Sequence, residues 1–159
     1  MYNGGLANES SYPYMGVNQT CSYKPEMASI GVIGGSYNIS VNEQDMAMHL
    51  YEKGPISVSF TVTPAFRSYA SGVYIDPKCP NGPLEVNHDV VAVGYGTQDL
   101  VDYWIVKNSW GPTWGDKGFF KMQRNTNMCG ISNCGSYPMD IVDLASTPAK
   151  TQNQVQFTQ

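Results

Sequence analysis

The chain has 159 residues, 42% of them hydrophobic and 14% charged, so it is long enough to form one domain with a sizeable core. Its formal net charge of -4, its sequence pI near 4.9 and the lack of any basic run argue against a nucleic acid as partner. No apolar stretch is long enough to cross a bilayer, and the 16 glycines, 10 prolines and 11 tyrosines favour a turn-rich, largely β architecture over a helical bundle.

The first residues carry conflicting signals about the cellular compartment. Met1 is followed by polar Asn3 and two glycines, not by a basic and then apolar leader, which taken literally indicates a cytosolic protein. Three N-glycosylation sequons contradict this interpretation. Their asparagines are Asn8, Asn18 and Asn38.

The first third of the chain is predicted to contain a loop region, one strand and one helix. Residues 1–29 are punctuated by glycine and proline, as is typical of loops. Residues 30–39 are predicted to form a strand with a bend or bulge at the glycine pair 34–35. Asn42 is a suitable N-cap for a helix that runs to about Lys53 and stops at the Gly-Pro that follows.

Apolar and polar residues alternate without a break over residues 56–62, which is typical of a half-buried strand. We expect the apolar side chains to face the core and the polar ones to face away. The core-facing residues are then Ile56, Val58, Phe60 and Val62, and the others are Ser57, Ser59 and Thr61.

Short elements fill the rest of the chain. We expect a helical turn at residues 64–69 and strands at residues 73–75, 118–124 and 136–142. Residues 143–159 have no hydrophobic period and few large apolar side chains, so we expect a disordered polar tail there.

Titratable, amide and aromatic residues gather within strand-like sequence only in residues 86–120. An apolar run follows His88, and a second run leads into Asn108, which predicts two neighbouring strands joined by a polar turn at residues 97–99. The imidazole and the carboxamide can then meet. A neutral imidazole takes a proton from a nucleophile, while an amide oxygen on its other ring nitrogen fixes its tautomer, and Trp110 could cover that hydrogen bond.

Each of these residues also has a plainer interpretation. A single histidine beside a strand is usually solvated or locally hydrogen-bonded, and an asparagine before Ser-Trp-Gly is usually a turn residue. The chain's two histidines, His49 and His88, lie far apart and lack Cys-x-x-Cys spacing nearby, so we expect neither a metal site nor a cofactor.

Four segments together resemble the papain-like cysteine proteases. NHDVVAVGYG and YWIVKNSWGPTWGDKGFF resemble the family's histidine and asparagine segments, and NMCGISNCGSYP with VTPAFRSYASGVY is most similar to the cathepsin H and aleurain branch. The resemblance extends from about residue 3 to about residue 141. It implies an α+β fold, in which residues 30–142 form the papain-like right domain, an antiparallel β-barrel-like sheet with one or two short helices, and residues 1–29 the loop-rich end of the left domain.

The resemblance implies that His88 is the general base, Asn108 its orienting residue and Trp110 the shielding indole. In the family the nucleophilic cysteine and a glutamine of the oxyanion hole lie upstream of these segments. None of the four cysteines here has the Cys-Gly-Ser-Cys-Trp context of that nucleophile. The implied partner is therefore a second chain, or a missing N-terminal part, that carries the catalytic cysteine.

The resemblance also implies a peptide or protein substrate. Residues that would border the pocket for the substrate's second residue are Ser59, Val86, Asp89 and Cys134, and those on the primed side are Trp110 and Trp114. Asp89 departs from the family pattern, because alanine or glycine usually follows the histidine. A carboxylate there could favour a basic substrate side chain, or it could perturb His88.

Four cysteines allow three ways of forming two bridges. The resemblance selects only one bridge, Cys79–Cys129, and matches Cys21 and Cys134 to positions whose family partners are not in this chain. One of those partners lies further upstream, and the other is a short propeptide remnant called the mini-chain. Alternatively, these two cysteines are buried free thiols, or they bond each other.

Two main functional hypotheses follow. In the first, the chain is part of a lysosomal or secreted cysteine peptidase and supplies the histidine and asparagine half of the site; the sequons and the family together favour that compartment. In the second, it is a catalytically inactive papain-like module with a binding or structural role on a partner protein. A third, an enzyme of another class, would use His88 with Asp89 or Asp140.

Overall fold

The computed structural model describes residues 5–32 and 34–144, and the chain divides into two compact units. The first unit comprises Met1–Ser36 and Pro138–Gln159, and the second comprises Tyr37–Tyr137. Residues 145–159 of the predicted tail lie outside the described residues. Within the described ranges, no helix is both long and apolar enough to span a membrane.

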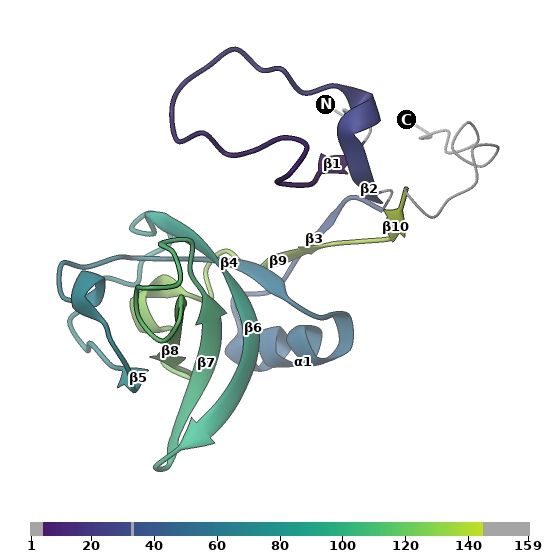
Figure 1. The fold of residues 1–159 in the computed structure, drawn as a ribbon. Helices are drawn as coiled ribbons and strands as arrows, with labels where there is room; N and C mark the ends of the chain where they lie inside the picture. Colours follow the sequence, from purple (N-terminus) through teal and green to yellow (C-terminus); the bar gives the residue numbers. More distant parts are fainter. Residues whose placement is uncertain (1–4, 33, 145–159) are drawn as a thin grey trace. The chain divides into compact units, whose positions relative to one another are not determined.

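The first unit contains a small antiparallel sheet of three strands (Figure 1). Its order is β1 (Leu6–Ala7), β2 (Ala28–Val32) and β10 (Ile141–Asp143). A long connection from β1 to β2 contains a single 3-10 turn, η1 (Pro25–Met27). Most of this connection is exposed and irregular, as the glycine and proline content of the segment predicts.

The second unit contains a seven-stranded sheet with one helix, and its long central strands curve strongly (Figure 1). The strands in spatial order are β3 (Ser36–Asn38), β9 (Ser136–Pro138), β4 (Ile56–Phe60), β6 (His88–Gln98), β7 (Val101–Lys107), β8 (Phe119–Gln123) and β5 (Val73–Tyr74). From β9 through β8 neighbouring strands run antiparallel, whereas β5 pairs with β8 in parallel. Two further 3-10 turns are η2 (Phe66–Ser68) and η3 (Met128–Gly130).

Two sequence-based predictions of single strands were wrong. Residues 30–39 are divided between β2 and β3, which belong to different sheets, and the break includes Gly35 at φ 77°. Residues 136–142 are likewise divided between β9 and β10, with Asp140 at φ 52° between them. Because a positive φ interrupts the extended backbone, neither segment can continue as one strand.

Helix α1 (Glu43–Lys53) is confirmed together with its predicted cap. Asn42 Oδ1 accepts hydrogen bonds from the backbone N–H groups of Gln44 at 2.8 Å and Asp45 at 3.3 Å. At the other end Gly54 has φ 92°, and its N–H donates to the Leu50 carbonyl. The face carrying Leu50 is buried in the core of the unit, which fixes the helix against the sheet.

The predicted alternation along β4 is confirmed, and Ile56, Val58 and Phe60 have no exposed surface. Thr61 is an exception to the prediction, because it is only 7% exposed and its hydroxyl donates to the Glu85 carbonyl at 2.9 Å. Edge-to-face aromatic contacts extend the core from Phe60 through Phe66 to Phe120. This aromatic layer lies beneath the start of β6, where His88 stands.

Candidate active site

The imidazole of His88 and the carboxamide of Asn108 are in hydrogen-bond contact, with Nε2 and Oδ1 2.9 Å apart. His88 begins β6, and Asn108 directly follows β7. The backbone N–H of Ser109 donates to the same Oδ1 at 2.8 Å. An amide oxygen can only accept, so Nε2 carries the proton and the neutral ring keeps the lone pair of Nδ1 for another partner.

A β-bulge places these two side chains on the same face of the hairpin. Val91 pairs with Lys107, but nearer the turn Gly94 pairs with Ile105, so β6 has one extra residue at Val93. Side chains alternate between the faces of a sheet, and a one-residue shift exchanges those faces. If the same residues of β6 paired without a bulge, His88 and Asn108 would lie on opposite sides of the hairpin.

Aromatic side chains enclose the imidazole on two sides. The His88 ring lies 5.7 Å from Phe60, edge to face, and 5.0 Å from the indole of Trp110. Asn108 is 7% exposed, and its backbone N–H donates to the Gly118 carbonyl at 2.9 Å. The Trp110 indole thus lies beside the imidazole.

Asn87, the residue immediately before His88, was not singled out by the sequence analysis, although its contacts hold the backbone at the start of β6. Its N–H donates to the Phe60 carbonyl at 3.1 Å, and its Oδ1 accepts from the Val62 N–H at 2.8 Å. These two bonds tie the start of β6 to the end of β4. The only available signal was a polar residue immediately before the histidine.

Among the residues predicted to border the substrate pocket, Ser59 and Asp89 come together. They face each other across β4 and β6, and the Ser59 hydroxyl donates to Asp89 Oδ1 at 2.6 Å. Asp89 is exposed, whereas Val86 is half-buried beside Gly130. Within the second unit no hydrogen bond joins Cys134 to this pair among the described residues.

The other predicted pair, Trp110 and Trp114, is in edge-to-face contact with ring centroids 4.9 Å apart. The Trp114 indole N–H donates to the carbonyl of Arg67 at 2.9 Å. The guanidinium carbon of Arg67 lies 6.0 Å from the centre of the Trp110 ring. The turn η2 and the two indoles therefore form one connected surface beside His88.

The structure joins Cys79 and Cys129 in a disulfide, as the family resemblance implied. Cys21 and Cys134 are free and exposed, so the alternatives of two buried thiols or of a mutual bridge were wrong. Hydrogen bonds from the backbone of Tyr23 and the hydroxyl of Tyr12 lower the pKa of the Cys21 thiol. The sequon asparagines are exposed on the surface; they are Asn8, Asn18 and Asn38.

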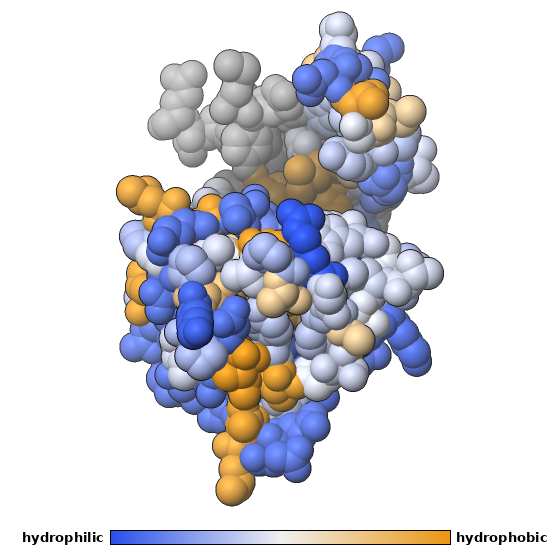
Figure 2. Space-filling view, turned by 90° about the vertical axis from the view of Figure 1, so that its left-hand side faces the viewer, coloured by the Kyte–Doolittle hydropathy of each residue, from blue (hydrophilic) through white to orange (hydrophobic). Residues whose placement is uncertain are grey.

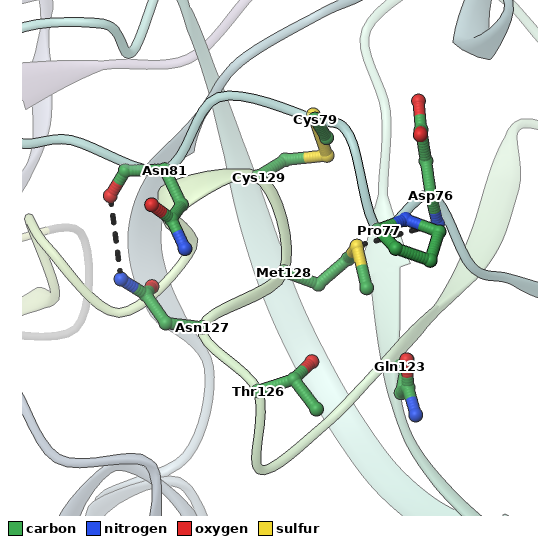
Figure 3. A pocket seen from close by; sticks show the side chains of 9 residues that line it. All are labelled: Asp76, Pro77, Cys79, Asn81, Gln123, Thr126, Asn127, Met128 and Cys129. Carbon is green, nitrogen blue, oxygen red and sulfur yellow. Dashed lines mark hydrogen bonds between the residues drawn. A yellow bond between two sulfur atoms is a disulfide. The ribbon is translucent and has the colours of Figure 1, made fainter.

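A cavity of about 330 Å³ lies beside the disulfide (Figure 3). Its one carboxylate, Asp76, already accepts hydrogen bonds from the Lys78 N–H and the Tyr74 hydroxyl. The lining residues include Met128, whose sulfur accepts from the Asp76 N–H. Nowhere in residues 5–32 and 34–144 do three or more histidine, cysteine or acidic side chains gather as a metal site would require.

Comparisons with known proteins identify the family of the chain. A family model described as "Papain family cysteine protease" matches residues 1–139. Oryzain gamma chain from Oryza sativa subsp. japonica is 50% identical over 141 residues, covering 87% of this chain and 38% of the relative. Thiol protease aleurain from Arabidopsis thaliana is 49% identical, covering 86% and 38%. Pro-cathepsin H from Mus musculus is 44% identical, covering 87% and 42%.

Solved structures of procathepsins have the same fold over part of their chains. Digestive procathepsin L2 proteinase from the larval midgut of Tenebrio molitor superposes with a TM-score of 0.80 at 40% identity, covering 86% of this chain and 43% of that one. Procathepsin L 3 from the same source gives a TM-score of 0.79 at 34% identity. The chain spans about 38% of the length of the first curated relatives that it matches.

Proposed function

Because this chain belongs to the papain family of cysteine proteases and has a papain-like fold, we propose that it supplies the histidine and asparagine part of a cysteine peptidase site. The observation that carries the proposal is the hydrogen bond of 2.9 Å between His88 Nε2 and Asn108 Oδ1. It leaves Nδ1 as the ring atom that can exchange a proton with a thiol. His88 is then the general base, and Asn108 is the residue that positions it.

The nucleophilic thiol is assigned to residues outside these 159. Cys79 and Cys129 are joined to each other, and no thiol of the second unit hydrogen-bonds the His88 ring among the described residues. A cysteine brought beside His88 Nδ1 would give up its proton and become a thiolate paired with an imidazolium. This ion pair is the reactive state of the proposed site.

The reaction then proceeds by covalent catalysis on a peptide or protein substrate. The thiolate attacks the carbonyl carbon of the scissile bond, the C–N bond breaks, and His88 gives its proton to the leaving amine. Water attacks the resulting thioester while His88 takes one of its protons, which releases the acid product and restores the thiol. Throughout both steps Asn108 holds Nε2, so the ring keeps its orientation.

Asp89 is proposed to select substrates in this site. The hydroxyl of Ser59 holds one carboxylate oxygen, and the side chain is exposed beside His88. A basic side chain at the substrate's second position would be attracted to the remaining negative charge. Asp89→Ala should lower hydrolysis of basic substrates relative to apolar ones, and equal changes on both series would dismiss this role.

We place the protein in a lysosomal or extracellular lumen. The Cys79–Cys129 disulfide suits an oxidising compartment, and the three sequon asparagines are exposed. Glycans on the natural protein should be released by a peptide amidase specific for N-linked sugars, with a matching fall in mass. An unchanged mass, together with free thiols at Cys79 and Cys129, would contradict this location.

The main test asks whether a reactive thiol accompanies the chain. Source material is labelled with a thiol-directed epoxide, and this chain is then purified under non-denaturing conditions. We expect a labelled polypeptide to be covalently continuous with the chain or to copurify with it. If the chain is intact and folded and no labelled polypeptide is present, the inactive binding module becomes the better hypothesis.

A matched pair of variants tests the role of the imidazole in the resulting assembly. His88→Ala should lower the rate of peptide hydrolysis by about 10²- to 10⁴-fold, because the base is lost. His49→Ala removes the chain's other histidine and should leave the rate nearly unchanged. Equal rates for the two variants would show that His88 does not act as the base.

A further inference from the structure

The guanidinium of Arg67 lies over the Trp110 indole, whose ring also lies beside His88. The guanidinium carbon lies 6.0 Å from the Trp110 centroid, and the indole centroid is 5.0 Å from the imidazole centroid. The cation and the proposed base therefore both lie beside the same indole, with their centres no more than about 11 Å apart. Three extended residues of a peptide span roughly 10 Å, so a substrate held at His88 can reach the cation within about three residues of the scissile bond.

The backbone around Arg67 is firmly held, although the side chain is exposed. Phe66 is fully buried in the aromatic core, and the Trp114 indole donates to the Arg67 carbonyl at 2.9 Å. The turn is closed by the Ser68 N–H on the Ala65 carbonyl. The guanidinium therefore extends from a fixed point, which lowers the entropy lost when it binds a ligand.

The charge of Arg67 is not neutralised within the second unit. In the part of the chain that the structure describes, the one ion pair is Arg124 with Asp102, and Arg67 takes no part in it. The side of this unit that carries β5 is mainly hydrophilic, with scattered apolar residues (Figure 2). The whole chain has a net charge of -4, so the positive charge of Arg67 beside the site is opposite in sign to that of the chain as a whole.

We propose that Arg67 binds a carboxylate of the substrate on the side of the leaving amine. The planar guanidinium can present two parallel N–H donors to both oxygens of a carboxylate, and the indole beneath it attracts the cation. The carboxylate belongs either to an acidic side chain or to the free C-terminus of the peptide. This inference rests on the proposed function and adds a preference for acidic groups to it.

The kinetic test uses the full chain in the peptidase assembly and compares matched substrates. One pair has Asp or Asn at the second position after the scissile bond, and the other ends there in a free carboxylate or a carboxamide. We expect the acidic member of at least one pair to have the higher kcat/KM. Arg67→Gln should lower that preference about 3- to 10-fold, and Arg67→Lys should lower it less.

A control variant removes the same charge elsewhere. Lys53→Gln, in the last turn of α1, changes the net charge equally and should leave the acidic preference unchanged. If Lys53→Gln lowers the preference as much as Arg67→Gln, the effect is general electrostatics and the proposal is overturned. It is also overturned if Arg67→Gln leaves both ratios as they were, even though the assembly hydrolyses peptides.

A binding measurement on the 159-residue chain decides the matter without any hydrolysis. N-acetylglycine is titrated while the indole N–H signal of Trp110, assigned with Trp110→Phe, is followed by NMR. We expect a saturable shift that N-acetylglycinamide does not cause and that Arg67→Gln abolishes. No shift, or the same shift in Arg67→Gln, refutes the inference, whereas loss of hydrolysis alone refutes only the proposed peptidase role.

Discussion

Two buried polar side chains of the second unit, Glu43 and Asn108, are used in different ways. Glu43 is 8% exposed, and its two oxygens accept from the Trp104 indole N–H at 2.7 Å and the Asn127 backbone N–H at 2.6 Å. It connects α1 to β7 and to the turn before η3. Asn108 is equally buried, but its oxygen accepts from the imidazole of His88, and its Nδ2 has no hydrogen-bond partner among the described residues.

The difference separates a structural role from a positioning role. Each oxygen of Glu43 is bonded within the core, so its whole free-energy contribution goes into holding distant segments together. Asn108 leaves one donor unpaired at some cost in stability, and it directs its acceptor at a half-buried ring. Variants of the two residues should therefore affect different measurements.

Glu43→Ala is expected to have the largest effect on stability. It removes two charge-assisted hydrogen bonds and leaves the Trp104 and Asn127 N–H groups unpaired, which should cost about 3–5 kcal/mol of unfolding free energy. Urea denaturation measures this loss. Glu52→Ala, an exposed site on the same helix, should change stability by no more than about 0.5 kcal/mol, and equal losses at the two sites would remove the structural role of Glu43.

Removing the disulfide should cost somewhat less. The double variant Cys79→Ser/Cys129→Ser opens a loop with a sequence separation of 50 and should lower the unfolding free energy by about 2–4 kcal/mol. Cys129 lies in the same turn as Asn127, which is a hydrogen-bond partner of Glu43. The stability lost when the disulfide and Glu43 are both removed should therefore be smaller than the sum of the two separate losses. If the two losses measured by urea denaturation are strictly additive, the disulfide and the hydrogen bonds of Glu43 stabilise different regions of the unit.

Asn108→Ala should cost about 1–2 kcal/mol of unfolding free energy, because it removes the hydrogen bonds from His88 and the Ser109 N–H but also removes the unpaired amide nitrogen. Its main effect should fall on His88, whose Nε2 proton loses its acceptor. We expect the Nε2–H signal in the imidazole NMR spectrum to broaden, and peptide hydrolysis by the assembly to fall about a hundredfold. An unchanged imidazole signal would mean that Asn108 does not position the ring.

The smallest effect is expected at alkaline pH, from Tyr69 beside Trp114. Burial raises the pKa of the Tyr69 phenol above its usual value of 10, and nearby Asp116 acts in the same direction. The folded state then favours the neutral phenol, so its contribution to stability is complete below about pH 10 and is lost as the pH rises further. Tyr69→Phe should reduce the loss of stability between pH 10 and pH 11, and an identical loss in both proteins would contradict this linkage.

Local features of the fold were predictable from the sequence, whereas long-range ones were not. The cap at Asn42 and the alternation along β4 depend on neighbouring residues, and both are confirmed. The structural role of Glu43 was not predicted, because its partner Trp104 lies 61 residues away along the chain. The buried Thr61 depends in the same way on a carbonyl 24 residues away.

Part of the candidate site was predictable for a different reason. His88 and Asn108 were expected to lie close together because each stands at the end of one of two predicted neighbouring strands. The register that puts both side chains on one face was not predicted. The bulge at Val93 was not predictable, because its Ala-Val-Gly surroundings match an ordinary apolar strand. The role of Asn87 depends on its contact with the end of β4, and the local sequence around Asn87 does not predict that contact.

The extra residue at Val93 lies between the turn of the hairpin and the pairs nearest His88. Losing it would leave a regular ladder in which Ala92 still lies opposite Val106, so the imidazole and the carboxamide would stay in phase. If the arm kept all its residues but paired without the bulge, every side chain from Ala92 back to His88 would exchange faces, and the imidazole would turn away from the carboxamide although both remained chemically intact. The pair therefore depends on where the surplus residue is accommodated as well as on which side chains are present.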